Sequence, residues 1–119
     1  MGDHLDRLRA ICLALPDVTE KISHGEPAWF VKKRLFAAFA GEHHDNRIAV
    51  WCAAPEGAQE AMIAADPEHY FRPPYVGPRG WIGVYLDVPL DWKDVEYAIR
   101  QAHRTVESKI SKPKPKKVV

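Results

Sequence analysis

The sequence predicts a single α+β domain in which helices pack on one antiparallel sheet. Short extended segments follow one another on tight links, which favours antiparallel pairing of neighbouring strands. Three longer stretches place apolar residues at helical spacing and can cover such a sheet. The 119 residues are enough for one hydrophobic core. The expected order of elements is α-β-β-β-α-β-β-α.

The chain is expected to begin with a helix at residues 3–14, which Pro16 ends. Its apolar side chains recur on one face, at Leu5, Leu8, Ile11, Cys12 and Leu15. We expect residues 16–27 to form a loop that closes with His24-Gly25-Glu26-Pro27.

Three strands are expected next. Residues 28–32 and 35–41 form the first two, joined by the short turn Lys33-Arg34. The second of them is apolar on both faces, which is typical of a central strand covered at least partly on both sides. Residues 47–52 form the third, with alternate side chains facing opposite sides of the sheet.

A second helix and two further strands follow. Pro55 begins the helix in the favoured first-turn position, and the Asp-Pro pair at residues 66–67 ends it. Residues 70–72 form a fourth strand, after which two consecutive prolines at 73–74 force the chain to turn. Residues 81–86 form the fifth strand.

The last helix is expected to begin at Asp91, whose side chain can cap it, with Asp94 favourable to the helix dipole. Its buried stripe comprises Trp92, Val95, Ala98, Ile99, Ala102 and Val106. We expect the folded domain to span residues 1–108. Residues 109–119 are too charged and too rich in proline to fold alone and form a disordered lysine-rich tail.

Charge is distributed unevenly, although the formal net charge is only +1. Residues 109–119 hold five lysines and no acid, whereas the rest of the chain carries 12 basic and 16 acidic side chains, a formal −4. Affinity for phosphate comes mostly from clustered cations. Any nucleic-acid binding must therefore come from a local patch or from the tail.

Nothing in the sequence indicates export or membrane insertion. No apolar run approaches the ~20 residues that cross a bilayer, and charges among residues 3–9 interrupt any signal-peptide core. We expect a cytoplasmic monomer. Cys12 and Cys52 are then buried thiols in a reducing compartment, with a disulfide or a shared metal as the alternative.

The most distinctive segment is residues 69–87, which contains five aromatic residues, two arginines, three prolines and three glycines. A stiff turn of this composition can present aromatic and cationic groups that stack on bases and clamp phosphates. The candidate residues are Arg72, Tyr75, Arg79 and Trp81. Alternatively, the aromatics plug the sheet edge and the arginines pair with surface acids.

Two further groups of cations could contact a phosphate backbone. The turn between the first two strands offers Lys32, Lys33 and Arg34. The tail offers Lys112, Lys114, Lys116 and Lys117. The alternative for the turn is that its charges are simply solvated.

No catalytic, metal or cofactor site is predicted. His24 and Glu26 could form an acid–base pair, but no nucleophile or metal set accompanies them, and we expect His24 to hold a loop backbone. His43-His44-Asp45 contains metal-ligand residue types, yet adjacent histidines on a turn face one ion poorly.

The motifs together resemble the MmcQ/YjbR family of small bacterial proteins. The resemblance rests on Ser23–Phe30, on residues 33–37, on Tyr70–Val84 and on the closing helix. It implies a curved antiparallel sheet and a DNA-binding role through paired hairpin wings, and it assigns no catalytic residues. One departure is Lys32-Lys33-Arg34, where the family commonly has glycine at a tight turn that needs positive φ.

These observations lead to two functional hypotheses. The first is a nucleic-acid-binding module, with DNA as its partner, that uses the basic hairpin, the Arg/aromatic loop and the tail with low sequence specificity. The alternative is a non-catalytic domain that binds a protein or a small ligand through the same aromatic loop. Neither hypothesis involves enzyme activity.

Overall fold

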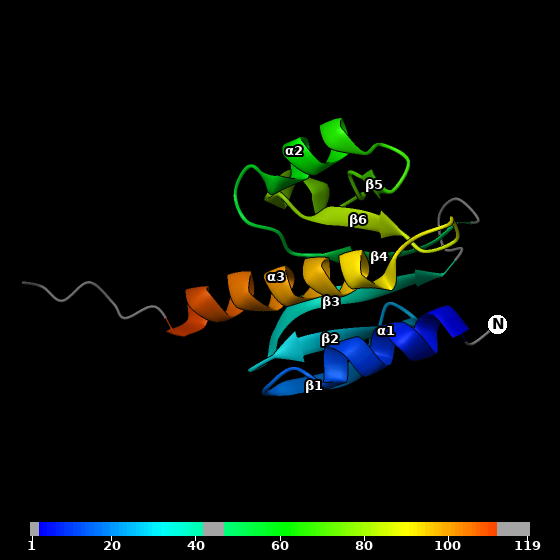
Figure 1. The fold of residues 1–119 in the computed structure, drawn as a ribbon. Helices are drawn as coiled ribbons and strands as arrows, with labels where there is room; N and C mark the ends of the chain where they lie inside the picture. Colours follow the sequence, from blue (N-terminus) through cyan, green and yellow to red (C-terminus); the bar gives the residue numbers. More distant parts are fainter. Residues whose placement is uncertain (1–2, 42–46, 112–119) are drawn as a thin grey trace, which may run out of the picture.

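The computed structural model describes residues 3–41 and 47–111. Within them the chain forms three α-helices, one short 3-10 helix and six strands (Figure 1). The elements are α1 (Asp3–Leu13), β1 (Val18–Ser23), β2 (Glu26–Val31), β3 (Arg34–Gly41), β4 (Ile48–Cys52), α2 (Ala58–Ala65), β5 (Tyr70–Phe71), the 3-10 helix η1 (Gly77–Arg79), β6 (Ile82–Tyr85) and α3 (Trp92–Ser111).

The strands form one antiparallel sheet in the order β1-β2-β3-β4-β6-β5. Helices α1 and α3 pack on the same face of this sheet, and α2 lies near its β5 edge (Figure 1). The pairing of β2 with β3 shifts register between Trp29 and Phe30, and such an irregularity bends the strands. The predicted α+β domain with a single antiparallel sheet is confirmed.

The core lies between the sheet and the helices α1 and α3. Helix α3 contributes a continuous apolar stripe, as predicted, with Val95, Ala98, Ile99, Ala102 and Val106 all buried. Trp92, at the start of the stripe, is only partly buried, because it lies at the helix end under the guanidinium of Arg7. The predicted cap is confirmed, since Asp91 accepts a hydrogen bond of 2.9 Å from the backbone N–H of Lys93.

Strand β1 replaces part of the loop expected at residues 16–27, and that prediction was wrong. The sequence Val-Thr-Glu-Lys-Ile-Ser lacks the apolar alternation of a half-buried strand. Within the described residues it forms an edge strand of the sheet, paired with β2. Its Glu20 faces inward because Arg9 of α1 and the indole N–H of Trp29 both donate hydrogen bonds to its carboxylate.

Two tight turns link the first three strands. His24-Gly25 connects β1 to β2, and Lys32-Lys33 connects β2 to β3. All four residues have positive φ, the backbone conformation of a type I′ hairpin turn. The second turn therefore lies one residue earlier than predicted, and its two lysines adopt the geometry that glycine adopts more easily.

Other boundaries move by a few residues. Helix α2 begins at Ala58, after Gly57, and not at Pro55. Strands β5 and β6 are shorter than predicted. Helix α3 continues to Ser111, three residues beyond the predicted end of the folded domain. The tail lysines Lys112, Lys114, Lys116 and Lys117 lie outside the described residues.

Membrane insertion of a helix finds no support in the described part of the chain. None of its helices combines the length and the apolar character needed to span a bilayer.

His69 connects the end of α2 to the loop that precedes α3. Its Nδ1 lies 2.8 Å from Oδ2 of Asp66, and its Nε2 lies 2.8 Å from the carbonyl oxygen of Pro89. Both partners are acceptors, so the doubly protonated ring satisfies them together. The hydrogen bond to Asp66, followed by the one to Pro89, raises the pKa of His69.

This contact predicts a pH-dependent stability. A raised folded-state pKa stabilises the protein fully below the ordinary histidine pKa of about 6.5, and that contribution disappears as the pH rises through the raised value. We expect the free energy of unfolding to decrease as the pH rises above about 6.5, and His69→Gln to reduce this dependence. Urea unfolding at a series of pH values measures it, with His4→Gln as the control. An identical pH profile in both variants would contradict the assignment.

Candidate functional site

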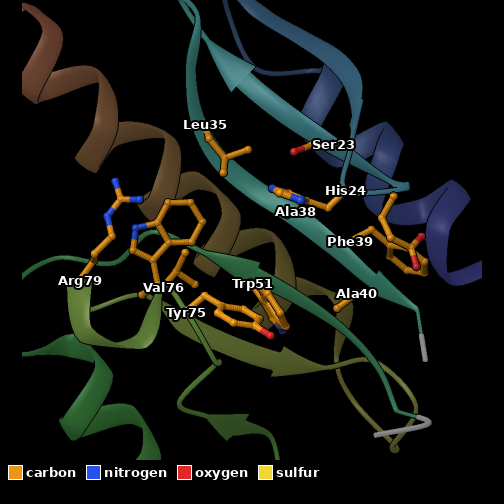
Figure 2. Close-up of a pocket in the computed structure, with 12 residues that line it drawn as sticks. Ser23, His24, Leu35, Ala38, Phe39, Ala40, Trp51, Tyr75, Val76 and Arg79 are labelled. Atoms are coloured by element: carbon orange, nitrogen blue, oxygen red, sulfur yellow. The ribbon is translucent and has the colours of Figure 1, made fainter. Parts of the chain in front are cut away.

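A pocket of about 630 Å³ opens on the sheet face opposite α3 (Figure 2). Three parts of the chain surround it: the β1–β2 hairpin, the middle strands β3 and β4, and the segment that contains η1. Its lining comprises Ser23, His24, Glu26, Leu35, Ala38, Phe39, Ala40, Trp51, Tyr75, Val76, Arg79 and Trp81.

The floor of the pocket consists of Ala38 and Ala40 on β3 and Trp51 on β4. Side chains alternate between the two faces of a strand. Cys52, which follows Trp51, is fully buried on the helical face, where its thiol lies 4.0 Å from the carbonyl oxygen of Ala98 on α3. Trp51 therefore faces the pocket, and the small alanines beside it leave room above the sheet.

One wall of the pocket is formed by residues 75–81, and helix α2 holds it in place. The buried Gln59 of α2 donates hydrogen bonds from its Nε2 to the carbonyl oxygens of Gly77 and Trp81. Gly80, with a φ of 87°, reverses the chain at the end of η1. The wall is thus anchored at both ends of the turn and presents a defined surface.

The aromatic residues of the wall differ in exposure. Tyr75 has 77% of its surface exposed, whereas Trp81 has only 4%. The guanidinium of Arg79 lies over the Trp81 ring, 5.5 Å from its centroid, which is within the range of a cation–π contact. Trp81 is therefore a buried support for Arg79, and Tyr75 is the more exposed ring of the wall.

The opposite side of the pocket is polar. His24 extends from the β1–β2 turn into the pocket (Figure 2). Glu26 follows at the start of β2, and its Oε2 accepts a hydrogen bond of 3.3 Å from the backbone N–H of Gly41 at the end of β3. This contact orients the carboxylate, and the turn places Ser23 beside it.

The structure brings together three of the residues predicted from the Arg/aromatic loop: Tyr75, Arg79 and Trp81. Arg72 is not among the lining residues; its Nη1 lies 3.4 Å from Oε1 of Gln59 and so supports the wall from behind. The hairpin cations are exposed at the β2–β3 turn and also lie outside the lining: Lys32, Lys33 and Arg34.

Sequence reasoning missed that Trp51, His24 and Glu26 belong to the same site. In the sequence, Trp51 is only one of the alternating residues of the strand expected at residues 47–52. By residue type His24 and Glu26 could form an acid–base pair, and the loop-holding role was predicted for His24 alone. The signal that could have placed His24 and Glu26 is a two-residue hairpin turn at His24-Gly25. Such a turn pairs the segments on either side of it as neighbouring strands.

The remaining candidates lie elsewhere. Cys12 and Cys52 are free and buried in the core. Burial raises the pKa of the Cys52 thiol to about 12 and raises that of Cys12 further, so both thiols are protonated and unreactive at neutral pH. His43, His44 and Asp45 lie outside the described residues.

The fold and the pocket define a small α+β protein with a ligand-sized cavity on an open sheet face. The family model of YjbR matches residues 13–105, and the chain belongs to the YjbR family. It is similar in fold to the crystal structure of Deinococcus radiodurans protein DR2400, with its domain DUF419. That similarity has a TM-score of 0.74 at 19% identity, over 88% of this chain and 79% of the other. A comparison with curated proteins gives no match.

Proposed function

We propose that this protein binds single-stranded nucleic acid without catalysis and with low overall sequence specificity. The observation that carries the proposal is the convergence of Tyr75, Trp51 and Arg79 on one pocket. Its volume of about 630 Å³ falls within the roughly 300–1,000 Å³ of small-ligand sites.

Stacking is the main interaction that the pocket offers. Tyr75 is largely exposed on the wall, and Trp51 is partly exposed on the floor. An unpaired base can stack on such rings, whereas a base inside a duplex cannot reach them. Arg79, exposed at the rim and stabilised over Trp81, can contact the phosphate next to that base.

We expect contacts with the phosphate backbone of the strand to continue from the pocket to the basic turn at residues 32–34. Arg34 immediately precedes Leu35, which lines the pocket, so Lys32 and Lys33 follow directly along the chain from its edge. These exposed cations can neutralise neighbouring phosphates without reading the bases. The lysines of residues 112–119 would add attraction of the same kind.

Titration of fluorescently labelled oligonucleotides tests the proposal. The full chain should bind a 10-nucleotide single strand of DNA or RNA more tightly than a duplex of the same sequence. Affinity should decrease between 50 and 200 mM salt, because phosphate contacts release counterions. Equal affinity for both forms would contradict binding through the pocket, and absence of binding at the lower salt would contradict the proposal as a whole.

Removal of residues 112–119 is expected to change the salt dependence. Four lysines are lost, and each phosphate contact on a single strand contributes about 0.7 to the slope of log affinity against log salt. If all four engage, the slope should flatten by about 3. A full-length variant with four lysine-to-glutamine changes in the tail is the matched control for length. An unchanged slope in both proteins would show that the tail takes no part.

A second candidate is a small planar ligand held by the same rings. The observations that support it are the formal charge of −4 outside residues 109–119 and the carboxylate of Glu26 in the pocket. On this reading a free nucleoside should bind as tightly as an oligonucleotide, and affinity should depend little on salt.

A further inference from the structure

The pocket has two ends of opposite character. Arg79 lies at one side, and Phe39 and Ala40 lie at the other, with Trp51 and Tyr75 between them (Figure 2). Glu26 belongs to the second end, because its carboxylate is bonded to the backbone N–H of Gly41, the residue after Ala40. A cation and a carboxylate are therefore separated by an aromatic and apolar floor.

These two ends favour different parts of a nucleotide. A phosphate next to a carboxylate is repelled, so the anionic group must lie at the Arg79 end. The group beside Glu26 must instead donate hydrogen bonds, since an ionised carboxylate only accepts them. The stacked ring then lies over Trp51, with its outer edge directed at Glu26.

The carboxylate of Glu26 retains capacity for such donors. It has about four lone-pair sites on its two oxygens, and the hydrogen bond from Gly41 uses one of them. That bond also fixes the orientation of the group before a ligand arrives, which lowers the entropic cost of binding. Two parallel N–H groups on a ligand match the two oxygens best.

Among the nucleobases, guanine has this edge, with the ring N1–H and the exocyclic amino group side by side. Cytosine and adenine place an acceptor nitrogen next to their amino group. Thymine and uracil flank their single N–H with carbonyl oxygens, which a carboxylate repels.

We infer that the pocket selects guanine at one position of the bound strand, with its Watson–Crick edge on Glu26 and its phosphate toward Arg79. The inference rests on the proposed function and adds a preference at a single nucleotide to otherwise sequence-independent binding. A carboxylate–guanine pair is charge-assisted and bidentate, and good bidentate contacts discriminate between bases by a factor of about 5 to 150.

Three single-stranded 10-mers test it: ten thymidines, the same strand with one central guanine, and the same strand with inosine in that position. Inosine keeps the ring N–H of guanine and lacks the amino group. A single guanine also avoids four-stranded assembly. The full chain should bind the guanine strand about 5 to 150 times more tightly than the thymidine strand, with the inosine strand in between.

Glu26→Gln is the decisive variant, because glutamine keeps an acceptor for Gly41 and loses the second acceptor oxygen. It should abolish the preference for guanine while binding the thymidine strand at least as well as the native protein does. Glu60→Gln is the control, since it removes the same charge from an exposed position on α2. Thermal unfolding checks that both variants are folded.

Different failures have different meanings. Equal binding of the three strands by the native protein, or a guanine preference that persists in Glu26→Gln, would overturn the inference and leave the proposed function standing. Absence of binding to every strand at low salt would overturn both. A preference lost equally in Glu60→Gln would assign the effect to overall charge and also overturn the inference.

Discussion

Replacing Trp29 with alanine is expected to lower the free energy of unfolding by about 3–5 kcal/mol. Trp29 lies on β2, is fully buried between the sheet and the helices, and belongs to the main hydrophobic cluster. Its truncation removes the largest fully buried side chain of the described residues and leaves a cavity that the rigid sheet fills poorly.

The same substitution loosens the edge of the sheet. The indole N–H of Trp29 donates a hydrogen bond of 2.9 Å to Oε1 of Glu20, whose carboxylate also accepts three hydrogen bonds from Arg9 on α1. The bond from Arg9, more than that from Trp29, lowers the pKa of Glu20. Glu20 therefore keeps its charged partner Arg9 in the variant and loses its side-chain hydrogen bond to β2.

Urea unfolding at neutral pH measures the effect, and Trp51→Ala is the matched control. Trp51 is partly exposed on the pocket face, so its removal should cost clearly less stability than the removal of Trp29. A loss below about 1 kcal/mol for Trp29→Ala would contradict its place in a rigid core.

Replacing Tyr75 with alanine is expected to weaken single-strand binding by about 1–3 kcal/mol, the contribution of one stacked base. This corresponds to a factor of about 5 to 150 in the dissociation constant. Stability should change little, because 77% of the Tyr75 side chain is exposed. The salt slope should also remain nearly the same, since stacking neutralises no phosphate.

Tyr97→Ala provides the control for this prediction. Tyr97 is 61% exposed on α3, on the opposite side of the sheet from the pocket. Both variants lose one exposed tyrosine, and only the first loses a pocket wall. Equal affinities for a labelled single strand in the two variants would show that Tyr75 does not stack on a base.

Elements with strong local signals were predicted well. The stripe of α3 and its cap at Asp91 follow from spacing and residue type alone, and both are confirmed. Strand β1 was missed because the hydrogen bonds of its polar side chains are made in tertiary contacts. The main example is Glu20, whose carboxylate accepts hydrogen bonds from Arg9 and Trp29. Such contacts join residues far apart in the chain and leave no periodic pattern behind.

The candidate site was predicted only in part, for a similar reason. Residues 75–81 form one local turn, so their shared position could be inferred. Their approach to Trp51 and to Glu26 depends on sheet order and hairpin register, which no single segment specifies. Burial of Trp81 could not be inferred either, because a tryptophan beside an arginine is compatible with both a stacking platform and a buried support.

The most direct test of the central claim is to locate the bound base. A single-stranded 10-mer that contains one 5-iodocytosine and no guanine can be cross-linked to the full chain by ultraviolet light, and the modified peptide identified by mass spectrometry. The account predicts cross-links at Trp51 or Tyr75, and their loss when unlabelled strand is added in excess. Cross-links confined to the basic hairpin or to residues 112–119 would contradict a base seated in the pocket.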